Sequence, residues 1–193
     1  MSASGDVISK LQELETSPPT TQRAEAYSST LSEIINSFSG SDLAANLVAY
    51  VRSILSDNIG VIASRPLLSG FVEQYRNLKD NDVKVEAGNE IIQLLAPKTV
   101  SFEQQDTDLK FALADAYEAE EDFTSSAKTL QVITLDSSQR SVSDNEKAQV
   151  WMRICRCYLE EDNPTNAVTY LNRLKQFIYN VSDQVIKLQF QLS

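Results

Sequence analysis

Apolar residues recur at intervals of three and four positions through nearly all of this sequence. One run consists of Tyr27, Leu31, Ile34, Ile35 and Phe38. Such spacing places side chains on one face of an α-helix, whereas a half-buried strand needs strict alternation. The only strand-like stretches, residues 60–62 and 99–100, are short, and we interpret them as connectors. The sequence therefore predicts an all-α protein.

Few residues interrupt the helical pattern, since five glycines and five prolines occur among 193 residues. A helix usually begins after a polar side chain that accepts a hydrogen bond from a free backbone amide, and proline is tolerated in the first turn. A serine paired with Glu or Gln three positions later forms a capping box. We expect helix starts at Ser64 before Pro66, Ser101 with Gln104, Ser143 with Glu146, and Asn163 before Pro164.

A helical unit occurs twice, in residues 113–133 and 154–174, at an offset of 41 positions. The matched pairs include Ala114 with Cys155, Tyr117 with Tyr158, Glu121 with Asp162, and Leu130 with Leu171. Residues 151–158 also fit the Trp-x-x-Leu-Gly-x-x-Tyr pattern of tetratricopeptide repeats. One helix pair cannot bury both of its faces, so neighbouring pairs must stack. We predict a tetratricopeptide-like α-solenoid of antiparallel helix pairs, with extra residues near positions 136–138.

We expect residues 1–193 to form a single N-terminal helical-repeat domain. Residues 1–16 would be a short terminal helix or partly disordered, and residues 101–193 hold the clearest repeats. A last apolar stripe comprises Val181, Val185, Leu188 and Leu192, and nothing caps it. We therefore expect the chain to be a piece of a longer protein.

The chain contains no histidine. This excludes Ser-His-Asp and Cys-His nucleophiles, a histidine general base and histidine-ligated zinc. Cys155 and Cys157 are two positions apart, which fits neither a zinc clamp nor a Cys-x-x-Cys redox pair, so we interpret them as packing residues in a reducing compartment. We expect no enzymatic activity, no cofactor and no metal site. A helical scaffold that holds partners fits best.

The formal net charge is −10, and acidic residues gather between Glu103 and Glu146. An acidic chain repels phosphate groups, which disfavours nucleic acid as a partner. No apolar run approaches the ~18 residues that a membrane span needs, and the first residues lack the features of a secretory signal. We expect neither nucleic acid nor a membrane among the partners.

Two acidic runs are candidate sites. Residues 118–122 could form a metal or acid–base site, a solvated helix end, or an acidic docking patch for a basic partner. Consecutive carboxylates fan outward on a helix and do not converge on one ion, which favours the solvated helix end. Residues 80–82 lack the later ligands of a calcium loop and indicate a turn with a helix cap.

Four basic residues could bind a partner. Arg153 and Arg156 share a helix face and either pair with neighbouring acids or face a partner. Together with Arg173 and Lys175 they form the one cluster that could hold a peptide carboxylate, as a tetratricopeptide-type adaptor would. The repeat pattern places the only tryptophan, Trp151, in the core.

Three stretches carry a family resemblance. The first is residues 60–71, Gly-Val-Ile-Ala-Ser-Arg-Pro-Leu-Leu-Ser-Gly-Phe, and the second is residues 100–105, Val-Ser-Phe-Glu-Gln-Gln, leading into residues 113–123. The third, residues 154–173, contains Tyr-Leu-Glu-Glu-Asp-Asn-Pro. In order and spacing they resemble the N-terminal half of the subunit 4 family of the COP9 signalosome.

The resemblance implies a helical-repeat arm that the family follows with a PCI domain, which is absent from this chain. It implies a non-catalytic scaffold subunit of a complex that removes Nedd8 from cullin-RING ubiquitin ligases, with the zinc active site in another subunit. The implied partners are the other signalosome subunits, mainly through the PCI half, and the neddylated cullin-RING ligase, which the arm would help to recognise. The implied location is cytoplasm and nucleus. A PCI-family subunit of the proteasome lid and a peptide-binding tetratricopeptide-type adaptor remain alternatives.

Overall fold

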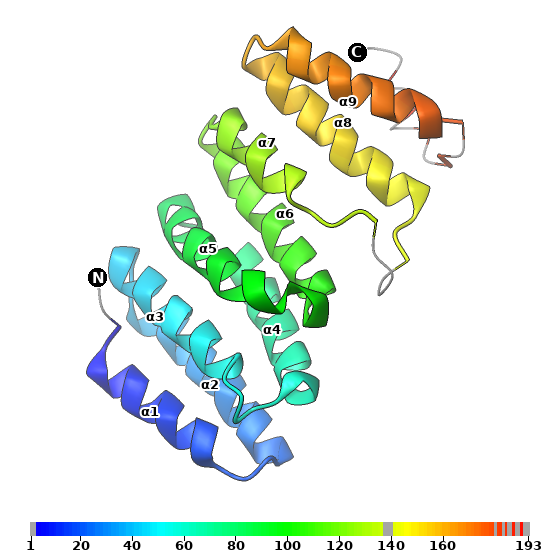
Figure 1. The fold of residues 1–193 in the computed structure, drawn as a ribbon. Helices are drawn as coiled ribbons and strands as arrows, with labels where there is room; N and C mark the ends of the chain where they lie inside the picture. The colour runs from blue at the N-terminus through cyan, green and yellow to red at the C-terminus, as the bar shows by residue number, and fades with distance from the viewer. Residues whose placement is uncertain are drawn as a thin grey trace. The chain divides into compact units, whose positions relative to one another are not determined.

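The structure is a computed structural model that describes residues 3–136 and 141–179, together with positions 181, 182, 184, 187 and 190. Within these residues every regular element is helical (Figure 1). The elements are α1 (Gly5–Thr16), α2 (Thr21–Ser37), α3 (Gly40–Ile54), α4 (Val61–Arg76), α5 (Asn81–Leu95), the 3₁₀ helix η1 (Ala96–Ser101), α6 (Glu103–Ala119), α7 (Phe123–Gln131), α8 (Asp144–Glu160) and α9 (Pro164–Phe177). The predicted all-α, helical-repeat fold is confirmed.

The chain divides into two compact units, residues 1–116 and residues 117–193. Most of α6 belongs to the first unit, and its last turn belongs to the second. The expectation of a single domain stays a prediction. Val185, Leu188 and Leu192 of the predicted last stripe, and Ser137 and Ser138 between the repeats, lie outside the described residues.

Helix α3 is the central element of the first unit, because α1, α2, α4 and α5 all pack against it. Apolar side chains cover most of its circumference, which is typical of a helix buried inside a helical protein. The most deeply buried of its large apolar residues are Leu47, Tyr50, Val51 and Ile54. Packing of four neighbours around this one helix determines the core of residues 1–116.

A row of four aromatic rings crosses this core. The ring centroids of Tyr27 and Tyr50 are 5.9 Å apart, those of Tyr50 and Phe71 are 6.0 Å apart, and those of Phe71 and Tyr75 are 5.9 Å apart. None of the four side chains is more than 1% exposed. Such ring pairs contribute about 0.5–1.5 kcal/mol beyond the burial of their area. The row therefore fastens α2, α3 and α4 to one another.

Polar side chains cap several helices as the sequence predicts. The side chains of Asp80, Ser143 and Asn163 accept hydrogen bonds from the backbone amides of Val83, Glu146 and Asn166. Each bond satisfies an amide that has no partner inside its own helix. The predictions of a turn and cap at residues 80–82, and of helix starts at Ser143 and Asn163, are confirmed.

The predicted start of α4 at Ser64 is wrong, because α4 begins at Val61. The backbone of Gly60 has a φ of +77°, which lets the chain turn sharply just before the helix. Ser64 is buried, and its hydroxyl contacts the carbonyl oxygens of Gly60 and of Ile54 at the end of α3. Pro66 therefore lies inside the helix, where it cannot donate a backbone hydrogen bond.

The predicted capping box of Ser101 and Gln104 is also wrong. Ser101 belongs to η1, and the first turn of α6 is closed by a hydrogen bond to the backbone carbonyl of Phe102. The amide of Gln104 instead donates to the carboxylate of Asp108 over 3.0 Å. Phe102 is only 2% exposed, so burial of its ring determines where α6 begins.

The two copies of the repeat have the same turn. Glu121 and Asp162, the matched residues at the ends of α6 and α8, both have a positive φ, 61° and 50°. The amides of Asp122 and Asn163 each donate over 2.9 Å to the carbonyls of the matched residues Tyr117 and Tyr158. This six-to-one bond, with a left-handed residue before its donor, is the Schellman ending of a helix. The side chains of Asp122 and Asn163 then cap the next helix, so each turn is compact and its helices run antiparallel.

Close packing between α4, α5 and α6 depends on Gly88. A Cβ atom at this position would clash with the Tyr75 hydroxyl and would lie 3.0 Å from Cδ1 of Leu113. The hydroxyl is held in place because it donates to the backbone carbonyl of Lys84. Only glycine lets the helices approach this closely.

We expect Gly88→Ala to destabilise the chain by about 1 kcal/mol, because overpacking costs ~1–3 kcal/mol and the better helix propensity of alanine returns up to ~1 kcal/mol. Urea denaturation followed by far-UV circular dichroism measures the change. In the double variant with Tyr75→Phe the clashing hydroxyl is absent, so the two substitutions should cost less together than the sum of their separate costs. Strict additivity would contradict this account of Gly88.

Candidate functional site

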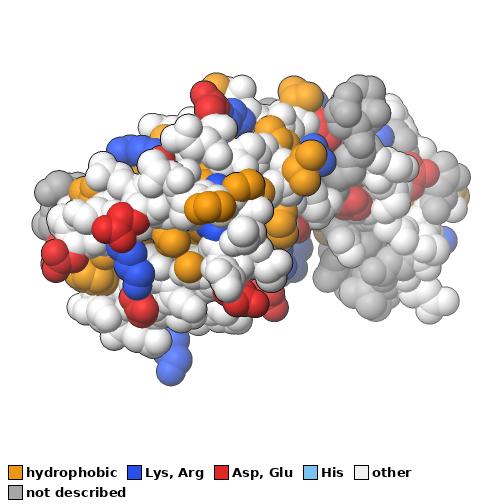
Figure 2. All heavy atoms as spheres, turned by 90° about the horizontal axis from the view of Figure 1, so that it is seen from below, with side chains coloured by type: hydrophobic (Ala, Val, Ile, Leu, Met, Phe, Trp, Pro, Cys, Tyr) orange, Lys and Arg blue, Asp and Glu red, His pale blue; other side chains and the backbone are white. Residues whose placement is uncertain are grey.

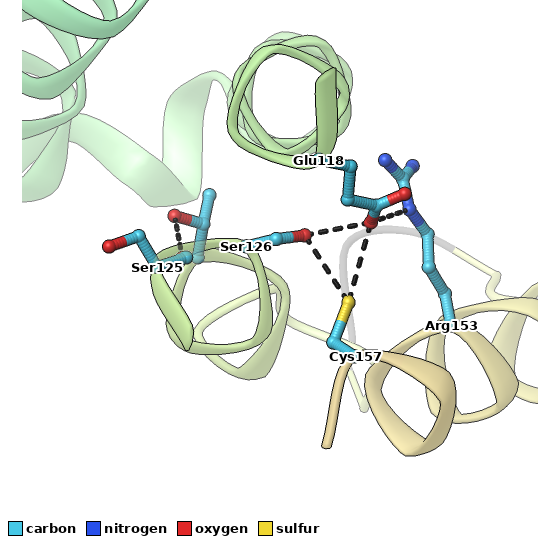
Figure 3. A network of polar contacts seen from close by, with 6 residues as sticks. Glu118, Ser125, Ser126, Arg153 and Cys157 are labelled. Atoms are coloured by element: carbon cyan, nitrogen blue, oxygen red, sulfur yellow. Dashed lines mark hydrogen bonds and ion pairs between the residues drawn. The ribbon is translucent and has the colours of Figure 1, made fainter. Parts of the chain in front are cut away.

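Within the second unit, a polar network of four side chains joins the last turn of α6 to α7 and α8 (Figure 3). The Glu118 carboxylate accepts from Nε of Arg153 over 2.7 Å and from the hydroxyl of Ser126 over 2.8 Å. Sγ of Cys157 lies 3.5 Å from both the Glu118 carboxylate and the Ser126 hydroxyl. Oε1 of Glu118 takes part in all three of these contacts to the carboxylate.

The repeat turn positions these four residues. Glu118 lies in the last turn of α6, and the Schellman turn brings Ser126 on α7 back toward it. Arg153 and Cys157 are four residues apart on α8, so they face the same way. Ser126 is completely buried, and the Glu118 and Arg153 side chains are 31% and 23% exposed. The network therefore lies at the edge of the helix interface.

The electrostatics of the network stabilise the Glu118 carboxylate. Burial alone would raise the pKa of Glu118, but hydrogen bonds from Arg153 and Ser126 and the charge of Arg153 outweigh it and hold that pKa below its ordinary value. Burial raises the pKa of Cys157 to about 11, and the hydrogen bond to Ser126 opposes this only in part. A thiol with that pKa is protonated at neutral pH and is a poor nucleophile. The network thus ties helices together and has no activated reacting group.

We expect Glu118→Gln to lower the free energy of unfolding by about 1 kcal/mol near pH 7. Hydrogen bonds to charged groups usually contribute about 1.5–3 kcal/mol, and the contribution is smaller here because the pair is partly exposed. Since the folded-state pKa of Glu118 is depressed, its stabilisation is present above the unfolded-state pKa and is lost as the pH falls through the folded-state pKa. Urea midpoints of the two proteins should therefore converge at acidic pH. The exposed Glu120→Gln serves as the control, and an equal loss there would contradict the assignment.

The acidic run that the sequence singles out serves structural roles. Glu118 is paired with Arg153, Glu121 occupies the left-handed position of the turn, and Asp122 caps α7. Within the described residues no group of three or more Asp, Glu, Cys or His side chains is arranged to hold a metal ion. The helix-end interpretation of the run is supported, with Glu118 as a partly buried exception.

The four basic candidates make separate contacts in the described part of the chain. Arg153 pairs with Glu118, so of its two open alternatives pairing with an acid is the one observed. The guanidinium of Arg173 lies 5.1 Å from the ring centroid of Tyr170, and Lys175 donates to Asn172. Arg156 lines a small cavity with Arg153, whereas Arg173 lines a different one. Which residues bind a partner stays open, as it was from the sequence.

The residues predicted to pack inside the second unit do so. Trp151 is 8% exposed, and Cys155 and Cys157 are buried as free thiols. The sequence analysis missed that Cys157 faces a charged network. The available signal was that Arg153 and Cys157 are four positions apart and that an acidic turn lies one repeat earlier. Only the tertiary packing brings these two side chains to Glu118.

Two features of the first unit had no clear signal in the sequence. Asp106 and Lys110, four residues apart on α6, form an ion pair of 2.6 Å whose side chains are 2% and 7% exposed. A groove of about 470 Å³ runs between α1, α3 and α5. It is lined by Ala3, Ile8, Leu11, Gln12, Glu15, Ala44, Ala45, Val48, Ala49, Arg52, Ser53, Glu86 and Glu90.

The surface also carries exposed apolar side chains. On the face shown in Figure 2, hydrophobic side chains (orange) lie among acidic and basic ones. The most exposed large apolar residues described are Ile62, Val100 and Tyr179, at 89%, 70% and 88%. In the described part of the chain, no helix combines the length and the apolar character that crossing a membrane requires.

Comparison with known proteins identifies relatives along nearly the whole chain. The family model described as "PSMD12/CSN4, N-terminal" matches residues 6–193. COP9 signalosome complex subunit 4 of Emericella nidulans is 39% identical over 187 residues, which are 97% of this chain and 46% of the relative. The subunits 4 of Neurospora crassa and Arabidopsis thaliana are 35% and 33% identical over 97% and 89% of this chain, and 47% and 42% of their own lengths. The chain thus spans about half the length of these relatives.

Proposed function

Since the chain belongs to the PSMD12/CSN4 N-terminal family, we propose that it is the helical-repeat arm of a non-catalytic scaffold subunit of the COP9 signalosome. The observation that carries this proposal is the similarity to signalosome subunit 4 from three organisms over 89–97% of the chain. All three of these relatives are named COP9 signalosome complex subunit 4, which favours the signalosome over the proteasome lid.

The chemistry of the described residues supports a scaffold role. The Glu118 network holds three helices together, and the Cys157 thiol, with a pKa of about 11, is not an activated nucleophile. Paired helices with compact turns give each repeat a rigid outer face, and rigid faces of this kind are what helical-repeat proteins use to hold partners.

At the finer level, the arm helps to recognise neddylated cullin-RING ligases, so that Nedd8 is removed by another subunit. Contacts with the other signalosome subunits lie mainly in the part of the relatives that this chain does not span. The protein acts in cytoplasm and nucleus. These statements follow from the resemblance of residues 60–71, of residues 100–105 with 113–123, and of residues 154–173 to the family.

Affinity purification of the tagged full-length protein from its own cells tests the assignment. We expect the other signalosome subunits to co-purify in equal amounts, and a variant lacking residues 1–193 to retain them. The purified complex without the arm should bind a neddylated cullin-RING ligase more weakly than the intact complex does. Co-purification of proteasome lid subunits instead would assign the chain to the lid.

The peptide-binding adaptor is a second candidate that the same material can test. Charge reversal at the exposed Arg156 and Arg173 should leave ligase binding unchanged if the chain does not hold a peptide through its basic residues, and it spares the pair of Arg153 with Glu118. A peptide array probed with the chain should show no preference for free carboxyl termini. A clear preference that these two variants abolish would favour the adaptor.

A further inference from the structure

The groove between α1, α3 and α5 points to an interaction surface with a definite chemistry. We propose that it binds a basic, amphipathic helix of a partner protein. The inference relies on the proposed scaffold function only for the premise that the chain binds other proteins. It does not depend on which complex contains the chain.

The groove exists because two helices pack on opposite sides of α3 without covering the face between them. α1 is held on α3 by burial of Leu11, and by a hydrogen bond of 2.9 Å from the Ser4 amide to the side chain of Asn46. α5 is held by burial of Ala87 and Ile91 and by a hydrogen bond from Ser41 to Glu86. Both helices are thus held to α3, which lies between them in Figure 1.

The floor of the groove is lined by apolar side chains that are mostly small. Ala44 and Val48 lie at its bottom and are at most 5% exposed, whereas Ala45 and Ala49 are half-buried and open to the groove. Ile8 on the α1 wall is 38% exposed. Small side chains let an approaching backbone come close, and several apolar side chains can enter a space of about 470 Å³. The floor therefore fits the apolar stripe of a partner.

The rim of the groove is acidic. Glu15 lies on the α1 side, and Glu86 and Glu90, four residues apart, lie on the α5 side, while Arg52 is the one basic residue in the lining. None of the three glutamates takes part in an ion pair within the described residues. A partner with lysine or arginine on both sides of its apolar stripe would pair with both walls. Charge complementarity of this kind selects partners and speeds their encounter.

The helical walls and the size of the groove favour a helix as its occupant. The floor and both walls are helices whose backbone groups are already hydrogen-bonded, so no free sheet edge is available for an extended peptide. A helix with side chains is about 10–12 Å across, too wide to sink fully into this space. It would lie along the groove with one face inserted, which requires apolar residues at the spacing i, i+3, i+4 and i+7.

A fluorescently labelled model peptide tests the proposal. The probe is a helix of about 20 residues, long enough to be stable, with leucine and alanine in one stripe and lysine on both flanks. Fluorescence anisotropy measures its binding to the chain. The expected result is saturable binding, and a peptide of the same stripe with glutamate in place of lysine should bind at least about tenfold more weakly.

Two variants of the chain separate the groove from general acidity. Glu86→Lys with Glu90→Lys should weaken binding by about tenfold or more, whereas the matched reversal Glu25→Lys with Glu73→Lys, at exposed positions outside the lining, should change it by less than about threefold. Ala49→Phe fills the floor without changing the charge and should also weaken binding about tenfold. Thermal melting confirms that each variant folds.

Several outcomes would overturn the proposal. They are an equal loss of peptide binding in both charge reversals, unchanged peptide binding in Ala49→Phe, and tighter binding of the glutamate peptide than of the lysine peptide. Sedimentation that shows a dimer disrupted by Ala49→Phe would assign the groove to a second copy of the chain. The assay contains no other signalosome subunit and no ligase, so peptide binding can be found even if the proposed function is wrong, and can be absent even if that function is right.

Discussion

Replacing Phe71 with alanine should lower the free energy of unfolding of this chain by about 3–5 kcal/mol, the usual cost of removing a fully buried ring. Phe71 is 0% exposed and lies in the middle of the aromatic row, with Tyr50 and Tyr75 on either side. Its loss leaves a cavity that both neighbouring rings border, and it removes two ring contacts. Because small domains are stable by only about 5–15 kcal/mol, the variant should be close to unfolding at physiological temperature.

Urea denaturation monitored by far-UV circular dichroism measures this effect, provided that the slope with urea stays constant. Ile62→Ala is the matched control, because it also shortens a large apolar side chain but at a position that is 89% exposed. We expect the control to shift stability by no more than about 0.5 kcal/mol. Similar losses in the two variants would show that the aromatic row does not organise the core.

The second large effect concerns the buried ion pair of α6. Lys110→Met should cost about 3–5 kcal/mol, because it leaves the Asp106 carboxylate buried without its counter-charge. The other carboxylate oxygen of Asp106 is also buried and has no hydrogen-bond partner among the described residues. The structure therefore offers little else to compensate the charge.

A double variant distinguishes loss of the charge pair from loss of packing. Asp106→Asn with Lys110→Met removes both charges at nearly the same volume and should recover much of the stability that Lys110→Met loses. Lys10→Met is the control, because its pair with Glu33 is exposed and should contribute at most about 1 kcal/mol. If Lys110→Met loses no more stability than Lys10→Met, the account of a buried ion pair between Asp106 and Lys110 is wrong.

The repeat turns illustrate what local sequence predicts well. Asp122 and Asn163 are good helix caps wherever they occur, and Tyr117 and Tyr158 mark matched helices at the offset of 41 positions. The hydrogen bonds of these turns span at most five residues. Such contacts form within one stretch of chain, so the pattern of residue types is sufficient to predict them.

The predicted helix starts at Ser64 and Ser101 fail for the opposite reason. Ser64 binds the end of the preceding helix, and Phe102 is drawn into the core, so a contact with another element outweighs the cap preference of the local sequence. The Glu118 network is similar, since its members come from α6, α7 and α8. Cap rules contain no information about such contacts.

The amino-acid sequence by itself determined the helical class, the duplicated unit, the family resemblance and the absence of histidine chemistry, because these depend on periodicity and residue type along one chain. The tertiary structure alone decided which carboxylates are paired and which line a groove. Glu118 and Glu86 are both helical glutamates in sequence, yet one meets Arg153 and the other borders the groove between α1, α3 and α5. The physical reason is that charge pairing and groove formation depend on distances between helices, and those distances are fixed by how the buried side chains pack.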